Sequence, residues 1–267
     1  MNIEKYFDPD EQPLDNIPED GGFTAIFRTV ACIGDSLSSG EFETLTPDGK
    51  KHYNDFFEYS WGQFMARTCG FKCYNFSKGG MTAKQYMETF AESKDFFNPE
   101  YASQAYIIAL GVNDLNHKWP LGTIDDVNDD DPGKNPDTFA GWYGRIVAKY
   151  KEIAPDAKFF FMTMPRSGNE SSDVNKAAHA KLLHDFADHY TNSYVIDFFR
   201  YAPVYDNAFK EKFYLLGHLN PCGYRLTGKM VAAYIDWIIR HNIGDFKRIG
   251  YNGTALSDSE LKKLQNN

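Results

Sequence analysis

The chain has 267 residues, of which 42% are hydrophobic and 24% are charged, and its formal net charge is −9. These proportions are typical of a folded chain and argue against gross disorder. No apolar run approaches the roughly 18–20 residues that a membrane span needs. A nucleic-acid binder would need a concentrated basic face, which the acidic balance does not suggest. We therefore expect neither a membrane protein nor a nucleic-acid binder.

The negative charge is concentrated in two segments. The first 20 residues carry seven carboxylates and one lysine, and the loop from Asp125 to Asp131 carries five aspartates, so the remaining body has a charge of about +2. The loop lacks the glycine and terminal glutamate of a calcium-binding loop, which predicts a solvated acidic loop. The opening residues contain no apolar segment typical of a signal peptide. We expect a cytoplasmic protein with free thiols, or a secreted one if a leader was removed.

Five short apolar runs, rich in β-branched and aromatic residues, predict strands. Each run is nearly continuous rather than alternating, as expected for strands buried on both faces of a parallel sheet. In chain order the runs are 29–33, 71–76, 105–110, 158–164 and 193–198.

Helical patterns lie between these runs. Thr82 followed by Gln85 fits a capping box that opens a helix through Phe90. Apolar residues at helical spacing follow Asp137 and Asp173, each of which can cap a helix. The pair Asn220-Pro221 supplies a cap and a first-turn proline for a final helix.

Strands that alternate with helices predict an α/β fold, a three-layer α/β/α sandwich around a five-stranded parallel sheet. No internal repeat or flexible linker divides the chain. We expect an acidic N-terminal arm over residues 1–24, one domain over 25–242 and a C-terminal tail over 243–267. In such a sheet the functional residues belong at the carboxyl ends of the strands.

Polar motifs follow the predicted strands at that edge. They are Gly34-Asp35-Ser36-Leu37 after the first strand, Lys78-Gly79-Gly80-Met81 after the second, Gly111-Val112-Asn113-Asp114 after the third, and Gly217-His218-Leu219 before the last helix. A serine hydroxyl becomes a good nucleophile when a histidine accepts its proton. Backbone N–H groups at glycine and an asparagine amide can stabilise the resulting oxyanion. Asp114 is expected to brace its loop.

These four motifs, in this order, resemble the blocks of the GDSL/SGNH hydrolases, a family of esterases and lipases. The resemblance covers roughly residues 29–240 and implies a flavodoxin-like SGNH hydrolase fold. It implies Ser36 as the nucleophile and His218 as the base. The backbone of Ser36, Gly80 and the Asn113 side chain are implied as the oxyanion hole. No cofactor or metal is implied. Ser38 stands where an α/β-hydrolase elbow has its second glycine, which disfavours that other fold.

The sequence departs from the family at one position. The family usually has an aspartate three residues before the histidine, and this chain has Leu215 there. Such an acid orients the imidazole, and its loss costs up to about 10⁴ in a related triad. Three readings stay open: a Ser36–His218 dyad held by a carbonyl or water, another carboxylate such as Asp206 or Glu211, or a weak or inactive site.

Other histidines have less motif support. His117, close after the Asn113 block, and Trp119 are expected to line the substrate pocket. His179, His184 and His189 are five residues apart, so they do not share the helix face that metal ligands need. We expect these three to be surface residues.

The sequence thus predicts a serine esterase that acts on small neutral acyl esters or carbohydrate acetyl esters through an acyl-enzyme. The acidic loop follows the Asn113 block and is expected near the pocket, where it would repel anionic substrates. A catalytically weak or inactive carbohydrate-binding or ligand-binding protein is the alternative. An acyl-CoA thioesterase is less favoured, because only Lys78, Lys84 and Lys118 offer charge for the phosphates. The expected partner is a small-molecule ester, and a homo-oligomer is left open.

Overall fold

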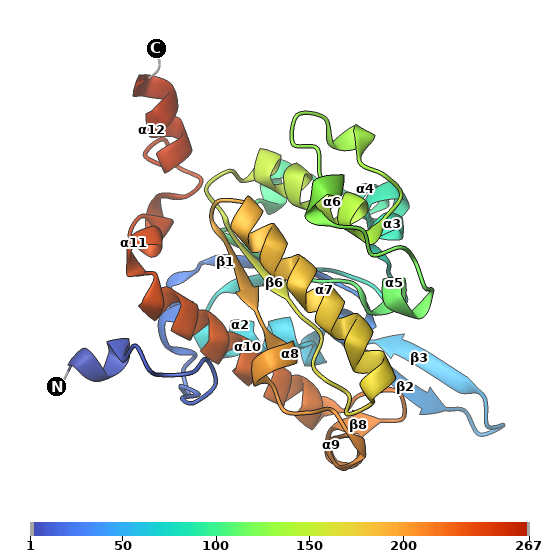
Figure 1. Cartoon of the computed structure of the whole chain (residues 1–267). Coiled ribbons are helices and arrows are strands. Elements are labelled where there is room, and N and C mark those ends of the chain that lie inside the picture. Colours follow the sequence, from blue (N-terminus) through green and yellow to red (C-terminus); the bar gives the residue numbers. More distant parts are fainter. Residues whose placement is uncertain (1–2, 266–267) are drawn as a thin grey trace.

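Five parallel strands form the central sheet of the structure, a computed structural model that describes residues 3–265 (Figure 1). The strand order is β4-β1-β5-β6-β7. The predicted fold class is confirmed, and the strand ends differ from the predicted ones by one or two residues. The strands are β1 (Thr29–Gly34), β4 (Lys72–Ser77), β5 (Ala105–Ala109), β6 (Lys158–Met162) and β7 (Ser193–Ile196).

Helices cover both faces of the sheet. Alternate residues of each strand point to opposite faces, so one strand contributes to two buried clusters. Val30 and Cys32 of β1 join one buried cluster, and Ala31 and Ile33 join the other. On the first face lie α2 (Trp61–Cys69) and α10 (Pro221–His241). On the second lie α3 (Ala83–Gln85), a π-helical turn (Tyr86–Phe90), α4 (Ala91–Ser93), α6 (Phe139–Ile153) and α7 (Glu170–His189).

The helix starts test the predicted caps. Asn220 accepts a hydrogen bond from the Gly223 N–H, and Thr82 forms its capping box with Gln85, as predicted. Two caps are wrong. Thr138, not Asp137, caps α6, and Asn169, not Asp173, caps α7. The Asp137 carboxylate instead pairs with Lys84.

Two hairpins were not expected from the sequence. The strands β2 (Glu41–Leu45) and β3 (Lys51–Asp55) pair antiparallel and project from the body of the molecule (Figure 1). Their charged residues conceal the strand pattern, although Thr46-Pro47-Asp48-Gly49 is a turn sequence. The strands β8 (Tyr214–Leu215) and β9 (His218–Leu219) form the second hairpin.

The remaining helices are short. They are α1 (Ser36–Ser39), α5 (Val112–Asn116), α8 (Phe198–Tyr201), α9 (Asn207–Phe213), α11 (Ile243–Phe246) and α12 (Asp258–Gln265). No helix within residues 3–265 combines the length and apolar character that crossing a membrane would require.

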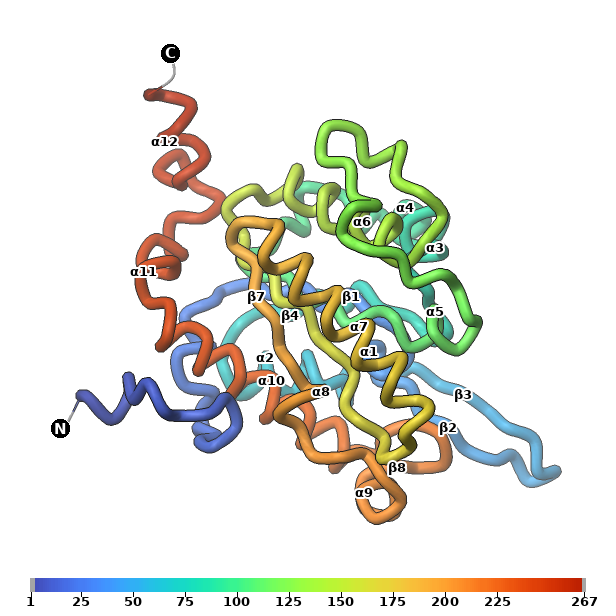
Figure 2. Tube along the Cα trace, in the orientation of Figure 1, coloured from blue at the N-terminus to red at the C-terminus, as the bar shows by residue number. Residues whose placement is uncertain are grey.

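The described part of the acidic N-terminal arm, residues 3–24, packs on α10, where the blue and orange-red segments lie close together (Figure 2). Residues 1 and 2 of the predicted arm lie outside the described residues. The Arg240 side chain, which is 3% exposed, forms ion pairs with Asp236 and with Glu11 of the arm. It also donates a hydrogen bond to the Tyr6 carbonyl oxygen. Much of the negative charge of the arm is exposed, as at Glu19, which pairs with Lys229.

Replacing Arg240 by methionine is expected to lower the free energy of unfolding by about 3–5 kcal/mol, because the buried Asp236 carboxylate loses its cation. Urea unfolding measures this loss. Lys229→Ala is the matched control on the same helix. Its partner Glu19 has a side chain that is 86% exposed, so a change below about 1 kcal/mol is expected. Equal losses in the two variants would contradict this account of the arm.

Candidate active site

The nucleophile motif forms a tight turn at the end of β1. The Asp35 carboxylate caps α1 by accepting a hydrogen bond from the Leu37 N–H at 3.0 Å. Ser36 is therefore the first residue of a one-turn helix, with its side chain half-buried. Gly34 is needed because a Cβ there would lie 2.3 Å from Ser38 Oγ. The local sequence thus fixes Ser36 at the carboxyl edge of the sheet.

A cavity of about 550 Å³ brings three of the expected site residues together. Ser36, Asn113 and His218 all line it, although they come from segments that are far apart in the sequence. Gly80 does not line this cavity. It lies in a separate hollow with Lys78 and Met81, and its φ of 74° is one that glycine adopts without strain.

Asn113 is tied to both neighbouring motifs. Its Nδ2 donates a hydrogen bond to the Met81 carbonyl oxygen at 3.1 Å and lies 3.4 Å from Asp35 Oδ2. Asp114 braces its loop as expected, because its carboxylate accepts hydrogen bonds from the Ala83 N–H. Burial raises the pKa of Asp35 to about 7 and that of Asp114 to about 6.

The expectation for His179 was wrong. This side chain is fully buried, and its Nε2 lies 3.1 Å from the Leu110 carbonyl oxygen. Burial lowers its pKa to about 4, so the ring is neutral near pH 7. It packs so closely on Gly111, whose φ is 127°, that a Cβ there would lie 2.4 Å from its Nε2. His179 therefore supports the loop that carries Asn113.

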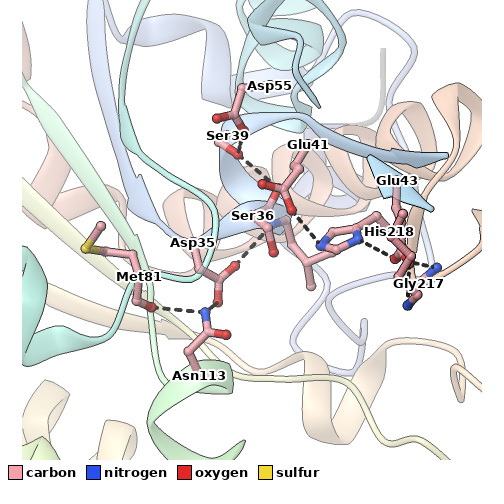
Figure 3. A network of polar contacts seen from close by, with 12 residues as sticks. Asp35, Ser36, Ser39, Glu41, Glu43, Asp55, Met81, Asn113, Gly217 and His218 are labelled. Carbon is pink, nitrogen blue, oxygen red and sulfur yellow. Dashed lines mark hydrogen bonds and ion pairs between the residues drawn. The ribbon is translucent and has the colours of Figure 1, made fainter. Parts of the chain in front are cut away.

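His218 contacts a carboxylate that was not expected from the sequence. Glu43 Oε2, on β2, lies 3.1 Å from His218 Nδ1 and accepts a hydrogen bond from the Gly217 N–H at 2.9 Å (Figure 3). The Glu43 side chain is only 3% exposed. Its other oxygen pairs with Lys51 at 2.6 Å, and Lys51 and His218 together hold the pKa of Glu43 below its usual value.

The carboxylates that sequence proximity favoured have other places. Asp206 caps α9 by accepting from the Phe209 N–H, and Glu211 is exposed on α9. Leu215 pairs with His218 across the β8–β9 hairpin and has no acidic group. The glutamates of β2 could have been found from the sequence only by recognising the hairpin.

A second glutamate of β2 faces the other side of the ring. Glu41 Oε1 lies 3.1 Å from His218 Nε2 (Figure 3). Burial raises the pKa of Glu41, and the proximity of His218 acts in the opposite direction. Within residues 3–265 no hydrogen bond joins Ser36 Oγ to His218. Tyr53 of β3 packs edge-on against the ring, with ring centroids 5.9 Å apart.

Two residues expected in the pocket lie outside it. His117 is exposed beyond α5, and Trp119 packs under the Lys84 ammonium, 4.9 Å from the ring centroid. Neither lines the cavity that contains Ser36 and His218. The short helix α5 (Val112–Asn116) carries the chain away from the site, so closeness to Asn113 in sequence is not closeness in space.

The acidic loop also lies elsewhere than expected. Asp129 pairs with His189 at the C-terminal end of α7, whereas Asn175 and Lys176 near the other end of this helix line the cavity. At 1.5 Å per residue, these two ends are about 20 Å apart, which exceeds the screening length in salt. Lys176 and Lys210 line the cavity, so its charge does not disfavour anionic substrates in the way expected from the acidic loop.

No metal centre is evident in the described part of the chain. There, no group of three or more His, Cys, Asp or Glu side chains is arranged to hold an ion. The carboxylates around His218 instead face the two nitrogens of its ring.

Solved structures of similar fold include three carbohydrate esterases. The family two enzyme of Clostridium thermocellum, in complex with cellohexaose, has a TM-score of 0.56 and 18% identity, covering 82% of this chain and 65% of its own. The family two enzyme of Cellvibrio japonicus has a TM-score of 0.53 and 16% identity, covering 79% of this chain and 62% of its own. This chain therefore spans less than two thirds of the length of either enzyme.

The third structure, a family 3 carbohydrate esterase of Clostridium thermocellum, has a TM-score of 0.52 and 12% identity, covering 79% of this chain and 96% of its own. At these identities the likeness shows the fold alone. No curated protein matches the sequence significantly.

Residues 32–226 match the model of the GDSL-like Lipase/Acylhydrolase family. The match spans well over half of the chain and includes Ser36, Gly80, Asn113 and His218. It confirms the resemblance on which the site was predicted: the chain belongs to the GDSL-like lipase/acylhydrolase family.

Proposed function

We propose that the protein is a serine ester hydrolase that works through an acyl-enzyme, with Ser36 as nucleophile and His218 as base. The observation that carries this proposal is the single cavity lined by Ser36, Asn113 and His218. These residue types at one rim of a parallel sheet supply a nucleophile, a proton acceptor and an oxyanion donor. Family membership supports the same reaction class.

The reaction would proceed in two halves. Ser36 Oγ attacks the ester carbonyl carbon while His218 Nε2 accepts its proton, and His218 then donates this proton to the leaving alcohol. Water attacks the acyl-enzyme with the same histidine as base. The oxyanion of each tetrahedral intermediate is assigned to the Ser36 N–H, the Gly80 N–H and the Asn113 amide. Loss of one such donor typically costs about 10²–10³ in turnover.

Glu43 is assigned the role of the acid that the sequence lacks at Leu215. Its contact with Nδ1 supports an atypical third member over a simple dyad. A carboxylate at Nδ1 fixes the ring with its Nε2 lone pair available for Ser36, and it stabilises the imidazolium that forms during attack. Lys51 keeps this carboxylate ionised, and the Gly217 N–H fixes its orientation.

The substrates that fit best are small acyl esters or acetyl esters of carbohydrate. The cavity is large enough for a short acyl chain and part of a sugar. Ser167, Ser172 and Asn175 line the cavity and offer polar groups for sugar hydroxyls. Exposed Tyr53 packs edge-on against His218 and offers an aromatic ring to a sugar bound next to His218. The likeness to carbohydrate esterases supports the same class.

An inactive or weakly active binding protein is the second candidate. The observation in its favour is the contact between Glu41 and His218 Nε2, the nitrogen that Ser36 needs. In that case the cavity would bind a carbohydrate or ester without turnover.

Wild-type protein is expected to hydrolyse p-nitrophenyl acetate and to release acetate from acetylated oligosaccharides. Ser36→Ala should reduce kcat by at least about 10³ because it removes the nucleophile. A fluorophosphonate probe should label wild type once per chain and should not label Ser36→Ala. Equal hydrolysis by both proteins would reject Ser36 as nucleophile. Stoichiometric binding of an oligosaccharide without labelling or hydrolysis would favour the binding protein.

Glu43→Gln is expected to lower kcat by about 10²–10⁴ with little change in KM, because the ring loses the charge that orients it and stabilises its protonated form. Glu43→Asp should retain part of the activity. The matched controls are Asp206→Asn, which keeps the cap of α9, and Glu211→Gln, and both should stay within about twofold of wild type. An unchanged kcat in Glu43→Gln would instead favour a Ser36–His218 dyad without an acidic third member.

A further inference from the structure

Both nitrogens of the His218 ring face carboxylates of the same strand. Glu43 Oε2 lies 3.1 Å from Nδ1, and Glu41 Oε1 lies 3.1 Å from Nε2. The Nδ1 contact is a hydrogen bond, and the Nε2 contact is an ion pair. A neutral imidazole carries one N–H, so attraction to both carboxylates needs one further proton. This proton is either on the ring, which is then an imidazolium, or on the Glu41 carboxyl. In both cases the Nε2 lone pair is not available to the Ser36 hydroxyl.

We propose that Glu41 holds His218 in a resting state, and that ester hydrolysis begins only when the Glu41 carboxylate leaves Nε2. This inference rests on the proposed function and adds to it the residue that sets the rate and pH range of the site. Glu41 leaves Nε2 when the shared proton passes to solvent, or when a bound ester displaces the Glu41 carboxylate. Ser36 Oγ then transfers its own proton to Nε2 as it attacks.

Glu41 is fixed close to the nucleophile by the backbone. The Tyr224 hydroxyl lies 2.6 Å from the Glu41 carbonyl oxygen and 3.3 Å from that of Ser36, so it holds both residues from α10. Gly79 also lies close to this side chain, because a Cβ at Gly79 would lie 1.9 Å from Glu41 Oε2. The glycine that precedes the proposed oxyanion donor therefore leaves the space that the Glu41 carboxylate occupies.

The orientation of the ring does not require Glu41. Glu43 already fixes Nδ1, and its position is set by Lys51 and the Gly217 N–H. A second carboxylate on Nε2 adds nothing to this orientation, while it occupies the position from which the serine proton must be accepted. The contact therefore lowers the rate of attack rather than raising it.

Several charged or titratable groups face Glu41 from the elements packed around it. Asp55 is its direct partner on β3, Glu43 is two residues along β2, and Asp35 lies in the turn before α1. His218 on β9 and Tyr224 on α10 complete the surroundings. Burial raises the pKa of Glu41, His218 acts against this rise, and Asp55 and Glu43 add to it, so a proton on Glu41 persists to higher pH than at an exposed glutamate. Activity should therefore rise with pH as this proton is released.

Glu41→Ala and Glu43→Ala form a matched pair, because the two residues contact the same ring from the same strand but should have opposite effects. Glu41→Ala is expected to raise kcat/KM for p-nitrophenyl acetate at pH 6 by roughly tenfold or more, because the close ion pair that occupies Nε2 is removed. The rate of fluorophosphonate labelling of Ser36 should rise equally, and the acidic limb of the pH profile should move to lower pH. Glu43→Ala should slow both reactions.

Glu41→Gln is the second variant, because it keeps the size of the side chain and removes its titration. The pH profile of this variant should lack the part of the acidic limb that is caused by titration of Glu41. A fall or no change in kcat/KM and labelling rate in Glu41→Ala, while wild type is active and Ser36→Ala is not, would overturn the role of Glu41 and leave the proposed function standing. Absence of hydrolysis and labelling in wild type and in Glu41→Ala would overturn the proposed function itself.

Discussion

The arrangement of the site depends on the reversal of the chain at Gly40, directly after the turn that carries Ser36. Gly40 has a φ of 86°, and a Cβ there would lie 2.4 Å from the Phe56 carbonyl oxygen, so no other residue fits this position. The Phe56 N–H donates a hydrogen bond to the Gly40 carbonyl oxygen and closes the base of the β2–β3 hairpin. Because the hairpin starts here, Glu41 and Glu43 lie within a few residues of Ser36 and contact the histidine.

The register of this hairpin decides what each residue of β2 can do. Side chains two residues apart on a strand point to the same face, and a shift of one residue would turn them all to the other face. Glu41 pairs with Asp55 and Glu43 with Tyr53, so the two glutamates and Tyr53 share the face toward His218. Phe42 points the other way and packs against Phe56, Tyr59 and Tyr224. The apolar contacts of Phe42 therefore keep both carboxylates on the ring.

Much of the fold was predictable because its signals are local. Buried strands of a parallel sheet appear as apolar runs, and the sheet brings their carboxyl ends together, which placed Ser36, Asn113 and His218 around one cavity. Glu43 could not be predicted in this way. It is 175 residues from His218 in the sequence and belongs to a hairpin whose charged residues conceal the strand pattern. The predictions for His117 and Trp119 were wrong for the converse reason. Both residues follow Asn113 closely in the sequence, but α5 carries the chain away from the site. The tight packing of His179 on Gly111 likewise has no local signal.

The proposed reaction develops a negative oxyanion as well as a positive imidazolium, so the carboxylates near Ser36 would act on it in two opposite ways. Negative charge near the ring favours the imidazolium, whereas negative charge near Asn113 weakens the oxyanion hole. These two effects are separated because burial raises the pKa values of the carboxyl groups next to Asn113. Glu43 is held ionised by Lys51 next to the ring, while Asp35 and Asp114, next to the Asn113 loop, have pKa values raised to about 7 and about 6. Below these pH values the two aspartates carry protons. In the proposed reaction the negative charge would then remain next to the ring, where it stabilises the imidazolium, and would be reduced near Asn113, where the oxyanion is assigned.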